Sequence, residues 1–215
     1  MTPLRGASVR NLLGPVVRAT YRVRVTGGHQ VPRQAGVLIL STYSGLLDPT
    51  ILSTNLTRPA AVVVGEGSTP PGWRETLGRI VVTEQTPGKG LRDAVGLLRE
   101  GHAVVMFPEG CSGTTGDFVA GAAYVQAQTG VPVVPVTVLG SAGARPTDPP
   151  RLRSAIDVVI GEPFTPTAVA DPAQRAAIMA IAEHMRQHFA DHVLLSRSRA
   201  GRGADAPATG HNGAL

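Results

Sequence analysis

The feature that most constrains the fold is a repeated alternation between short apolar runs and longer segments of helical character. The apolar runs are rich in β-branched residues and predict strands at Tyr21–Thr26, Gly36–Ser41, Ala60–Gly65, Ile80–Thr83, His102–Phe107, Val133–Leu139 and Ala155–Ile160. Helices are predicted at Pro49–Leu56, Gly90–Glu100, Gly121–Thr129 and Pro172–Leu195. Because the strands are apolar throughout, both faces of their sheet must be covered. We therefore expect an α/β fold, a single domain whose twisted, largely parallel sheet is flanked by helices.

The length and composition fit one globular domain. The chain has 215 residues, of which 42% are hydrophobic and only 4% aromatic, so disorder throughout is excluded and the core must be aliphatic. Three parts are predicted: a basic amphipathic segment over residues 1–20, the α/β domain over 21–195, and a disordered basic tail over 196–215. No run approaches the roughly 18 apolar residues of a membrane span. One cysteine, Cys111, excludes a disulfide framework.

Positive charge is concentrated at the N-terminal end. The first acidic residue is Asp48, and it is preceded by Arg5, Arg10, Arg18, Arg22, Arg24 and Arg33. Such a stretch attracts anionic lipid surfaces or phosphorylated substrates, and a solvated basic face is the plainer alternative. Nucleic acid is a poor partner, because stacking aromatic residues are scarce. With Leu12, Leu13, Val16 and Val17 beside the arginines, we predict a cytoplasmic protein bound peripherally to the cytoplasmic membrane face.

Several common site types are not predicted. The segment Thr86–Asp93 has a Gly-Lys pair but lacks the remaining residues of a phosphate-binding P-loop. The segment Pro108–Gly113 does not fit the Gly-x-Ser-x-Gly turn of serine hydrolases. His184, His188 and His192 repeat every fourth residue, but eight helical residues rise ~12 Å, so the outer two cannot share one ion. A polar helix face is favoured over a metal site, and only a pairwise site stays open.

Two loops carry a specific pattern. One predicted strand leads into Ser41–Leu52, which contains Asp48 and Pro49, and another leads into Phe107, Pro108, Glu109 and Gly110. A strand containing Pro135 follows. In order and spacing, these segments resemble the glycerol-phosphate and lysophosphatidic acid acyltransferase family over roughly Asn11 to Phe164. That family shows Asn-His, four residues and Asp-Pro after one strand, then Phe-Pro-Glu-Gly-Thr-Arg-Ser after another.

The resemblance implies a catalytic reaction that needs a base. In the family, the motif histidine removes a proton from a lipid hydroxyl, and the aspartate four residues beyond the pair orients that histidine. Here the histidine position is Tyr43 and the asparagine position is Thr42. A tyrosine with its ordinary pKa near ~10 is protonated at neutral pH, so Tyr43 is a poor substitute. The resemblance implies Asp48 and Tyr43 as catalytic positions in a degenerate motif, with His29 or His102 considered as a replacement base.

Substrate binding is implied for the second loop, with further departures. The candidate substrate-binding residues are Phe107, Pro108, Glu109, Gly110, Cys111 and Ser112. The two arginines expected near the acceptor phosphate align with Glu84 and Ser112, and Val119 and Ala120 stand where a lysine commonly precedes a helix start. Lysophosphatidic acid is therefore a doubtful acceptor. Replacement cations are sought at Arg74, Arg79, Lys89 or Arg92.

Structural roles compete with these site roles. Asp48 before Pro49 is typical of a helix start, where the carboxylate caps free amides. Glu109 and Gly110 fit a simple turn, although carboxyl ends of parallel strands are where α/β folds bind ligands. Cys111 is expected to be a small filler and not an acyl-accepting nucleophile, because no base is evident beside it.

The sequence therefore predicts an O-acyltransferase of the glycerolipid type. Its acyl donor would be acyl-CoA or acyl carrier protein, its acceptor a lipid or small-molecule hydroxyl, and no cofactor or metal is expected. The alternative is a catalytically inactive relative that binds acyl thioester, acyl carrier protein or lipid. A third hypothesis is an interaction protein that uses its basic surface alone. An anionic membrane surface is the expected partner in the first two cases.

Overall fold

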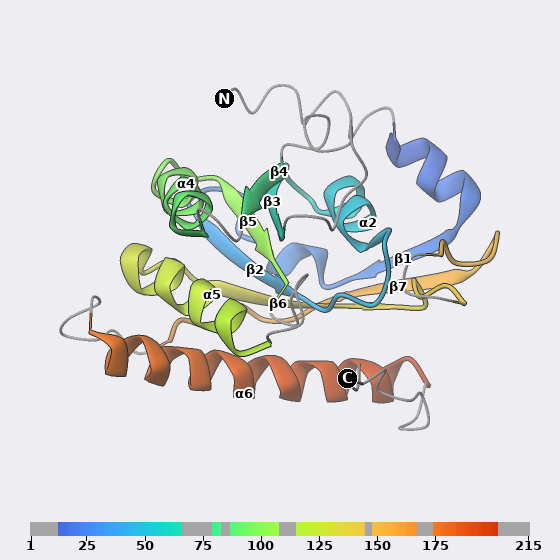
Figure 1. Cartoon of the computed structure of the whole chain (residues 1–215). Coiled ribbons are helices and arrows are strands. Elements are labelled where there is room, and N and C mark those ends of the chain that lie inside the picture. The colour runs from blue at the N-terminus through green and yellow to red at the C-terminus, as the bar shows by residue number, and fades with distance from the viewer. Residues whose placement is uncertain are drawn as a thin grey trace, which may run out of the picture.

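A computed structural model of the chain describes residues 13–65, 79–82, 87–107, 115–144, 148–166 and 174–201. Within them, seven strands form one sheet in the order β1-β7-β6-β2-β5-β3-β4 (Figure 1). The strands are β1 (Arg22–Thr26), β2 (Val37–Ser41), β3 (Ala60–Gly65), β4 (Arg79–Val82), β5 (Ala103–Met106), β6 (Val133–Leu139) and β7 (Ala155–Ile160). All neighbouring strands are parallel except β6 and β7. The predicted α/β fold with a largely parallel sheet is confirmed.

Helices cover both faces of this sheet. They comprise residues 13–20, the 3-10 helix η1 (Gly28–Gln30), α2 (Asp48–Asn55), α4 (Pro87–Arg99), α5 (Thr115–Thr129) and α6 (Arg175–Arg199). In Figure 1, α2 lies above the sheet while α5 and α6 lie below it. None of the helices in the described part of the chain is long and apolar enough to cross a membrane.

The alternation of side chains along β2 shows why its sequence is apolar throughout. Val37 and Ile39 pack with Ile51 of α2 in one core cluster, whereas Leu38 and Leu40 pack in the cluster formed by α4, α5 and α6. All five residues of β2 are buried. A strand with one polar face would leave one of these helical layers without an apolar partner, so β2 must lie near the centre of the sheet.

Several helix boundaries differ from those predicted, and α4, for example, begins at Pro87 instead of Gly90. Helix α5 begins at Thr115 instead of Gly121, and Gly121 lies inside it, with Leu91 of α4 close to its Cα hydrogen. Helix α6 continues to Arg199 and so passes the predicted domain end at residue 195. Ser196 is only 2% exposed and donates a hydrogen bond to the His192 carbonyl, so the predicted start of the tail at 196 is wrong. Residues 202–215 lie outside the described residues.

The strand directions define two edges of the sheet. Strands β2 to β6 all run the same way, and β1 and β7 run against them, because the β6–β7 pair is antiparallel and β1 is parallel to β7. The strands β2, β3, β4, β5 and β6 all end on one side of the sheet. We call this side, where their carboxyl ends lie, the carboxyl edge. The same edge therefore carries the amino ends of β1 and β7, and this places the N-terminal segment beside it.

Candidate active site

Tyr43 and Phe107 bring the two motif loops together at the carboxyl edge. They follow β2 and β5, which are adjacent and parallel with Leu40 opposite Met106. The two rings meet edge to face, with centroids 5.4 Å apart and planes at 73°. Phe107 is fully buried and Tyr43 is half-buried. The approach of the two strand ends, predicted from sequence, is confirmed by this contact.

Asp48 holds the loop after β2 in a compact turn. Its side chain is completely buried, and Oδ2 accepts hydrogen bonds from the backbone amides of Ser44 at 2.5 Å and Gly45 at 3.1 Å. The Asp48 amide in turn donates to the Gly45 carbonyl at 3.1 Å. The charged acceptor also lies in the first turn of α2, where the helix dipole favours a negative charge. Burial of this carboxylate is therefore offset by two amide donors and the helix end.

Asp48 lies at the start of α2, as predicted, but one residue after the N-cap position. Asp48 is the first residue of α2, and Leu47 is the N-cap residue, which makes no side-chain capping hydrogen bond. The carboxylate accepts from amides three and four residues before it, so it also holds the loop that precedes the helix. Pro49 occupies the first turn, as expected, because that position needs no amide hydrogen.

Thr42 extends the pairing of β2 with β6 beyond the end of the strand. Its amide donates to the Val136 carbonyl at 3.2 Å, and its side-chain Oγ1 accepts from the Val138 amide at 2.9 Å. Thr42 is buried, with 4% of its surface exposed. Sequence reasoning treated this residue only as a missing asparagine and missed its structural role. A hydrogen-bonding residue directly after a buried strand was the available signal.

Gly45 fits the loop tightly against the chain that follows β6. A Cβ atom at this position would lie 2.5 Å from the Ser141 carbonyl oxygen, which is far inside van der Waals contact. Ser141 itself is fully buried. The loop after β2 is thus fixed on three sides: by Asp48 within it, by the ring of Phe107, and by the segment after β6.

The two histidines considered as a replacement base lie at the wrong edge. His102 immediately precedes β5, and the four residues of that strand separate it from Phe107, so the two lie five residue steps apart, or ~16 Å at ~3.3 Å per step. Its Nε2 lies 3.6 Å from the Glu100 carboxylate. His29 lies in η1 after β1, whose carboxyl end is at the edge opposite the carboxyl edge. Neither residue reaches Tyr43 or Asp48, so that hypothesis is wrong.

Several predicted site residues cannot be placed. Pro108, Glu109, Gly110, Cys111 and Ser112 lie outside the described residues, and so do Glu84 and Arg74. Their proposed roles stay predictions.

The prediction that Val119 stands just before a helix start is wrong. It lies within α5 and packs against the core cluster beneath the sheet. Lys89 is exposed in the first turn of α4, which follows β4 and so begins at the carboxyl edge. Arg92 is exposed one turn further along. Among the replacement cations proposed, Lys89 therefore lies at the start of a helix that begins at the carboxyl edge, where the candidate site is.

The histidines of α6 divide into two environments. His188 stacks on Phe164 with centroids 4.4 Å apart, and His184 meets His188 edge to face at 4.7 Å. His192 instead packs over Gly161, and its Nε2 donates to the Val159 carbonyl at 3.1 Å. Burial lowers the pKa of His192 below its usual value of 6.5. Among the described residues, no group of three or more His, Cys, Asp or Glu side chains is arranged to hold a metal.

The part of the chain that contains both motif loops also matches a known protein family. The Acyltransferase family matches residues 22–139, which is more than half of the chain and includes the loops after β2 and β5. The chain belongs to the Acyltransferase family. The resemblance drawn from the two motif loops is thereby confirmed.

Curated relatives of this acyltransferase-family chain are glycerolipid enzymes. A chloroplastic 1-acyl-sn-glycerol-3-phosphate acyltransferase of Arabidopsis thaliana is 29% identical over 137 residues, covering 59% of this chain and 38% of the relative. A probable 1-acyl-sn-glycerol-3-phosphate acyltransferase of Mycoplasma pneumoniae is 27% identical over 136 residues, covering 57% and 51%. The chain therefore spans about half or less of the length of these relatives.

A solved structure has the same fold. The crystal structure of the 1-acyl-sn-glycerophosphate (LPA) acyltransferase from Thermotoga maritima matches with a TM-score of 0.59 and 19% identity. The match covers 86% of this chain and 76% of that chain. At this level of identity the match establishes the α/β architecture of the acyltransferase domain, and the chemistry must be argued from the residues of the chain itself.

Proposed function

We propose that this acyltransferase-family protein moves an acyl group from a thioester donor, acyl-CoA or acyl carrier protein, to the hydroxyl of a lipid or small molecule. The observation that carries the proposal is the buried Asp48 turn, which lies beside the Tyr43–Phe107 contact at the carboxyl edge. In open parallel sheets, ligands bind outside the carboxyl ends of the strands. The family match and the glycerolipid relatives supply the reaction class.

The proposed reaction is attack of the acceptor oxygen on the thioester carbonyl. The new C–O bond forms, the C–S bond breaks, and the hydroxyl proton ends on the departing thiolate or in solvent. A positioned base normally contributes ~10²–10⁴ in rate. Tyr43 occupies the position of the family's histidine, and a phenol with an ordinary pKa near ~10 is a weak base at neutral pH. We therefore propose slow transfer that depends mainly on positioning.

Acceptor recognition follows from the charges at the site. Glu84 and Ser112 stand at the two positions where the resemblance leads us to expect arginines, so an acceptor phosphate loses two bidentate partners. We propose an acceptor that is less anionic than lysophosphatidic acid, with exposed Lys89 as the candidate cation for any remaining negative charge.

A second candidate function is binding without turnover. It is favoured by the way Thr42 and Asp48 are used, because both contribute hydrogen bonds that hold the loop together. Under this alternative, the fold keeps a site for acyl thioester, acyl carrier protein or lipid, and the missing histidine marks a loss of catalysis.

The test is incubation of the pure protein with labelled acyl-CoA or acyl carrier protein donors and a panel of acceptors, followed by mass analysis of products. The panel contains lysophosphatidic acid, glycerol phosphate, lysolipids without net charge and simple alcohols. Acylated product that disappears in Asp48→Ala, with folding intact by thermal melting, supports transfer. Saturable donor binding by calorimetry with no product from any acceptor supports the binding alternative instead.

We propose that the protein acts at the surface of an anionic membrane. The acceptor class is amphipathic, and the sequence before Asp48 contains six arginines and no acid. The helix at residues 13–20 runs through Pro15 and exposes Val16, at 56% of its surface. An amphipathic segment of this kind is suited to the interface between headgroups and acyl chains.

A further inference from the structure

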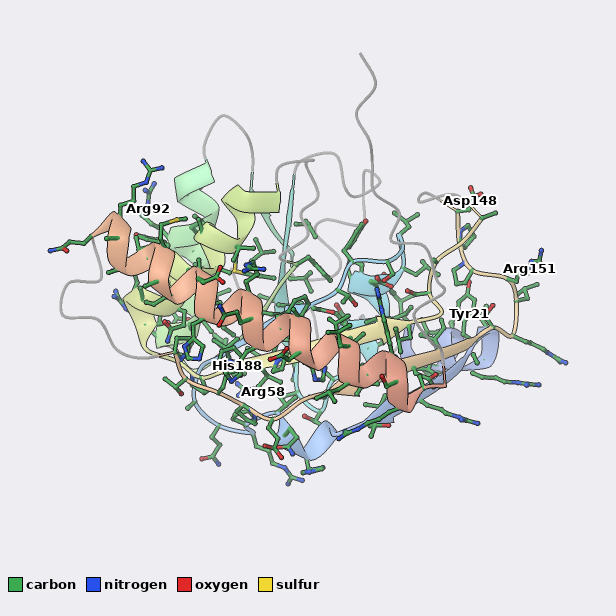
Figure 2. All side chains as sticks on the ribbon, turned by 90° about the horizontal axis from the view of Figure 1, so that it is seen from below. Tyr21, Arg58, Arg92, Asp148, Arg151 and His188 are labelled. Atoms are coloured by element: carbon green, nitrogen blue, oxygen red, sulfur yellow. The ribbon has the colours of Figure 1, made fainter. Side chains whose placement is uncertain are left out.

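A turn before β7 exposes an unusually large apolar side chain between two arginines. Leu152 is 80% exposed, the highest value among the large hydrophobic residues in the described part of the chain. Arg151 and Arg153 on either side are also exposed. Figure 2 shows Arg151 at the end of the molecule opposite Arg92, with its side chain directed away from the protein. One exposed leucine is ordinary, but its exposure at the tip of a basic turn requires explanation.

The backbone of this turn adopts a conformation that one of its residues disfavours. The Ser154 amide donates to the Arg151 carbonyl at 3.0 Å, so Leu152 and Arg153 are the central residues of a β-turn. Arg153 has a φ of +61°, in the left-handed region where glycine or asparagine is favoured. The arginine side chain is therefore retained at a position where the turn alone would be better served by glycine. This points to a role for the side chain outside the fold.

The turn is joined to the N-terminal helix. The Arg153 amide donates to the Thr20 carbonyl at 2.8 Å, and the Arg22 amide donates to the Ser154 carbonyl at 3.0 Å. One helical turn before Thr20, on the same helix face, lies the exposed Val16. The turn is thus joined to the end of this helix and the start of β1, and we call their exposed residues the basic patch: Val16, Arg22, Arg151, Leu152 and Arg153.

The basic patch lies at the same edge of the sheet as the candidate active site. Its turn immediately precedes β7, whose amino end is at the carboxyl edge because β7 is antiparallel to β6. β7 is two strands from β2, or ~10 Å at ~4.8 Å per spacing. The Thr42 bond to Val138, which is itself paired with Val158, links the site loop to β7 directly.

We propose that the basic patch is a docking surface for an anionic bilayer. Three arginines would contact lipid phosphates, while Leu152 and Val16 would insert among the headgroups. The nearby acid Asp148 leaves the local charge positive. The phosphates of a nucleic acid could also bind the arginines, but a nucleic acid offers no apolar region into which exposed aliphatic side chains could insert. A membrane offers both, so it is the better partner. Docking by this patch turns the carboxyl edge toward the lipid.

The proposal deepens the proposed function, because the orientation matters only if the acceptor is a lipid. Its test uses vesicle binding without any acyl donor, so that docking and acyl transfer can fail independently. The full chain is mixed with phosphatidylcholine vesicles that contain 0% or 30% phosphatidylglycerol by design, ~30% being a strongly anionic surface. Bound protein is measured after flotation at low and high salt.

The patch variant combines Arg22→Gln, Leu152→Ser and Arg153→Gly. The matched control combines Arg33→Gln, Met179→Ser and Arg175→Gln, which removes two exposed arginines and one exposed hydrophobic residue elsewhere. Each arginine near an anionic surface contributes about fivefold to partitioning, so the patch variant should bind about 25-fold more weakly or worse. The control should stay within about threefold of the unmodified protein. Equal losses in the two variants would overturn the proposal.

Folding and partner identity are tested separately. Arg153→Gly should keep or raise the melting temperature, because it relieves the positive φ, and Leu152→Ser alone serves if the triple variant does not fold. A Leu152→Trp variant in a Trp73→Phe background should be quenched by brominated lipid in anionic vesicles, and absence of quenching in bound protein would refute insertion. Patch-dependent binding to duplex DNA, with vesicle binding unchanged by the patch variant, would assign the surface to nucleic acid instead.

Discussion

The ring of Tyr43 rests edge-on against the ring of Phe107, with 5.4 Å between centroids, and so connects the ends of two adjacent parallel strands. This contact uses the tyrosine ring as a packing group at the position where the resemblance leads us to expect the histidine base. Ring packing and proton chemistry at this position are therefore separable by substitution.

Tyr43→Phe retains the ring contact with Phe107 and should therefore lower the free energy of unfolding less than Tyr43→Ala does. Tyr43→Ala removes the aromatic pair and buried ring surface, at a cost of roughly 1–3 kcal/mol, because the ring is only half-buried. Urea unfolding of both variants measures the difference. If Tyr43→Phe abolished acyl transfer that the unmodified protein performs, the phenol itself would take part in the reaction, contrary to our proposal.

Restoring the family residues should restore transfer to lysophosphatidic acid cooperatively. Tyr43→His supplies a base, while Glu84→Arg and Ser112→Arg supply phosphate contacts. Because proton transfer and positioning act on the same transition state, the triple variant should gain more than the single gains combined, up to ~10²–10⁴ in rate. The rates of product formation with each single and combined variant provide the measurement. Strictly multiplicative gains would show that the three positions act independently.

Asp48→Asn should destabilise the protein by about 1–2 kcal/mol. Oδ2 of Asp48 accepts from the Ser44 and Gly45 amides, and a neutral amide oxygen replaces these charge-assisted bonds with weaker ones. The exposed Asp93 of α4 offers a control, since Asp93→Asn should change stability by less than about 0.5 kcal/mol. Denaturant midpoints measure both. Equal effects of the two substitutions would mean that the Asp48 turn contributes nothing to stability.

Gly45→Ala should displace the loop after β2. The new Cβ would lie 2.5 Å from the Ser141 carbonyl oxygen, and backbone must shift to admit it, at a cost of about 1–3 kcal/mol. Gly96→Ala is the matched control in α4, where nothing lies within 4 Å and alanine should stabilise the helix by up to ~1 kcal/mol. Melting temperatures should therefore move in opposite directions. A stabilising effect at Gly45 would show that the loop is not closely packed.

His192 should make stability depend on pH. Its pKa is lowered in the folded protein, first by burial and also by the charge of Arg199, so the folded state resists a proton that the unfolded chain accepts near pH 6.5. The stability contributed by the neutral histidine is fully present above pH 6.5 and is lost as pH falls through the folded pKa. His192→Gln should flatten this part of the profile. The measurement is the free energy of unfolding of both proteins at pH 7.5 and at pH 5. An equal loss of stability in the unmodified protein and in His192→Gln would contradict the role of His192.

The strand pattern was readable from sequence because it is a local property. Buried parallel strands need apolar residues at every position, and β2 and β5 show this without reference to any neighbour. The Asp48 and Phe107 motifs were likewise visible, since each depends on residues that are contiguous in the chain. Helix ends were less predictable, because a glycine can lie inside a helix, as Gly121 does in α5, and because Ser196 is buried in α6 with a hydrogen bond to the His192 carbonyl.

What the sequence alone determined is the fold class, the family and the residues missing from its motif. Only the tertiary structure decided which residues share an edge of the sheet. The antiparallel β6–β7 pair sends His29 to the edge opposite Tyr43 and brings the Arg151–Arg153 turn to the same edge. Strand direction depends on pairing between distant segments, and no local pattern encodes it. Asp48 shows the opposite case, because its carboxylate accepts from Ser44 and Gly45, which are close to it in the chain, and the sequence predicted only its position at a helix start.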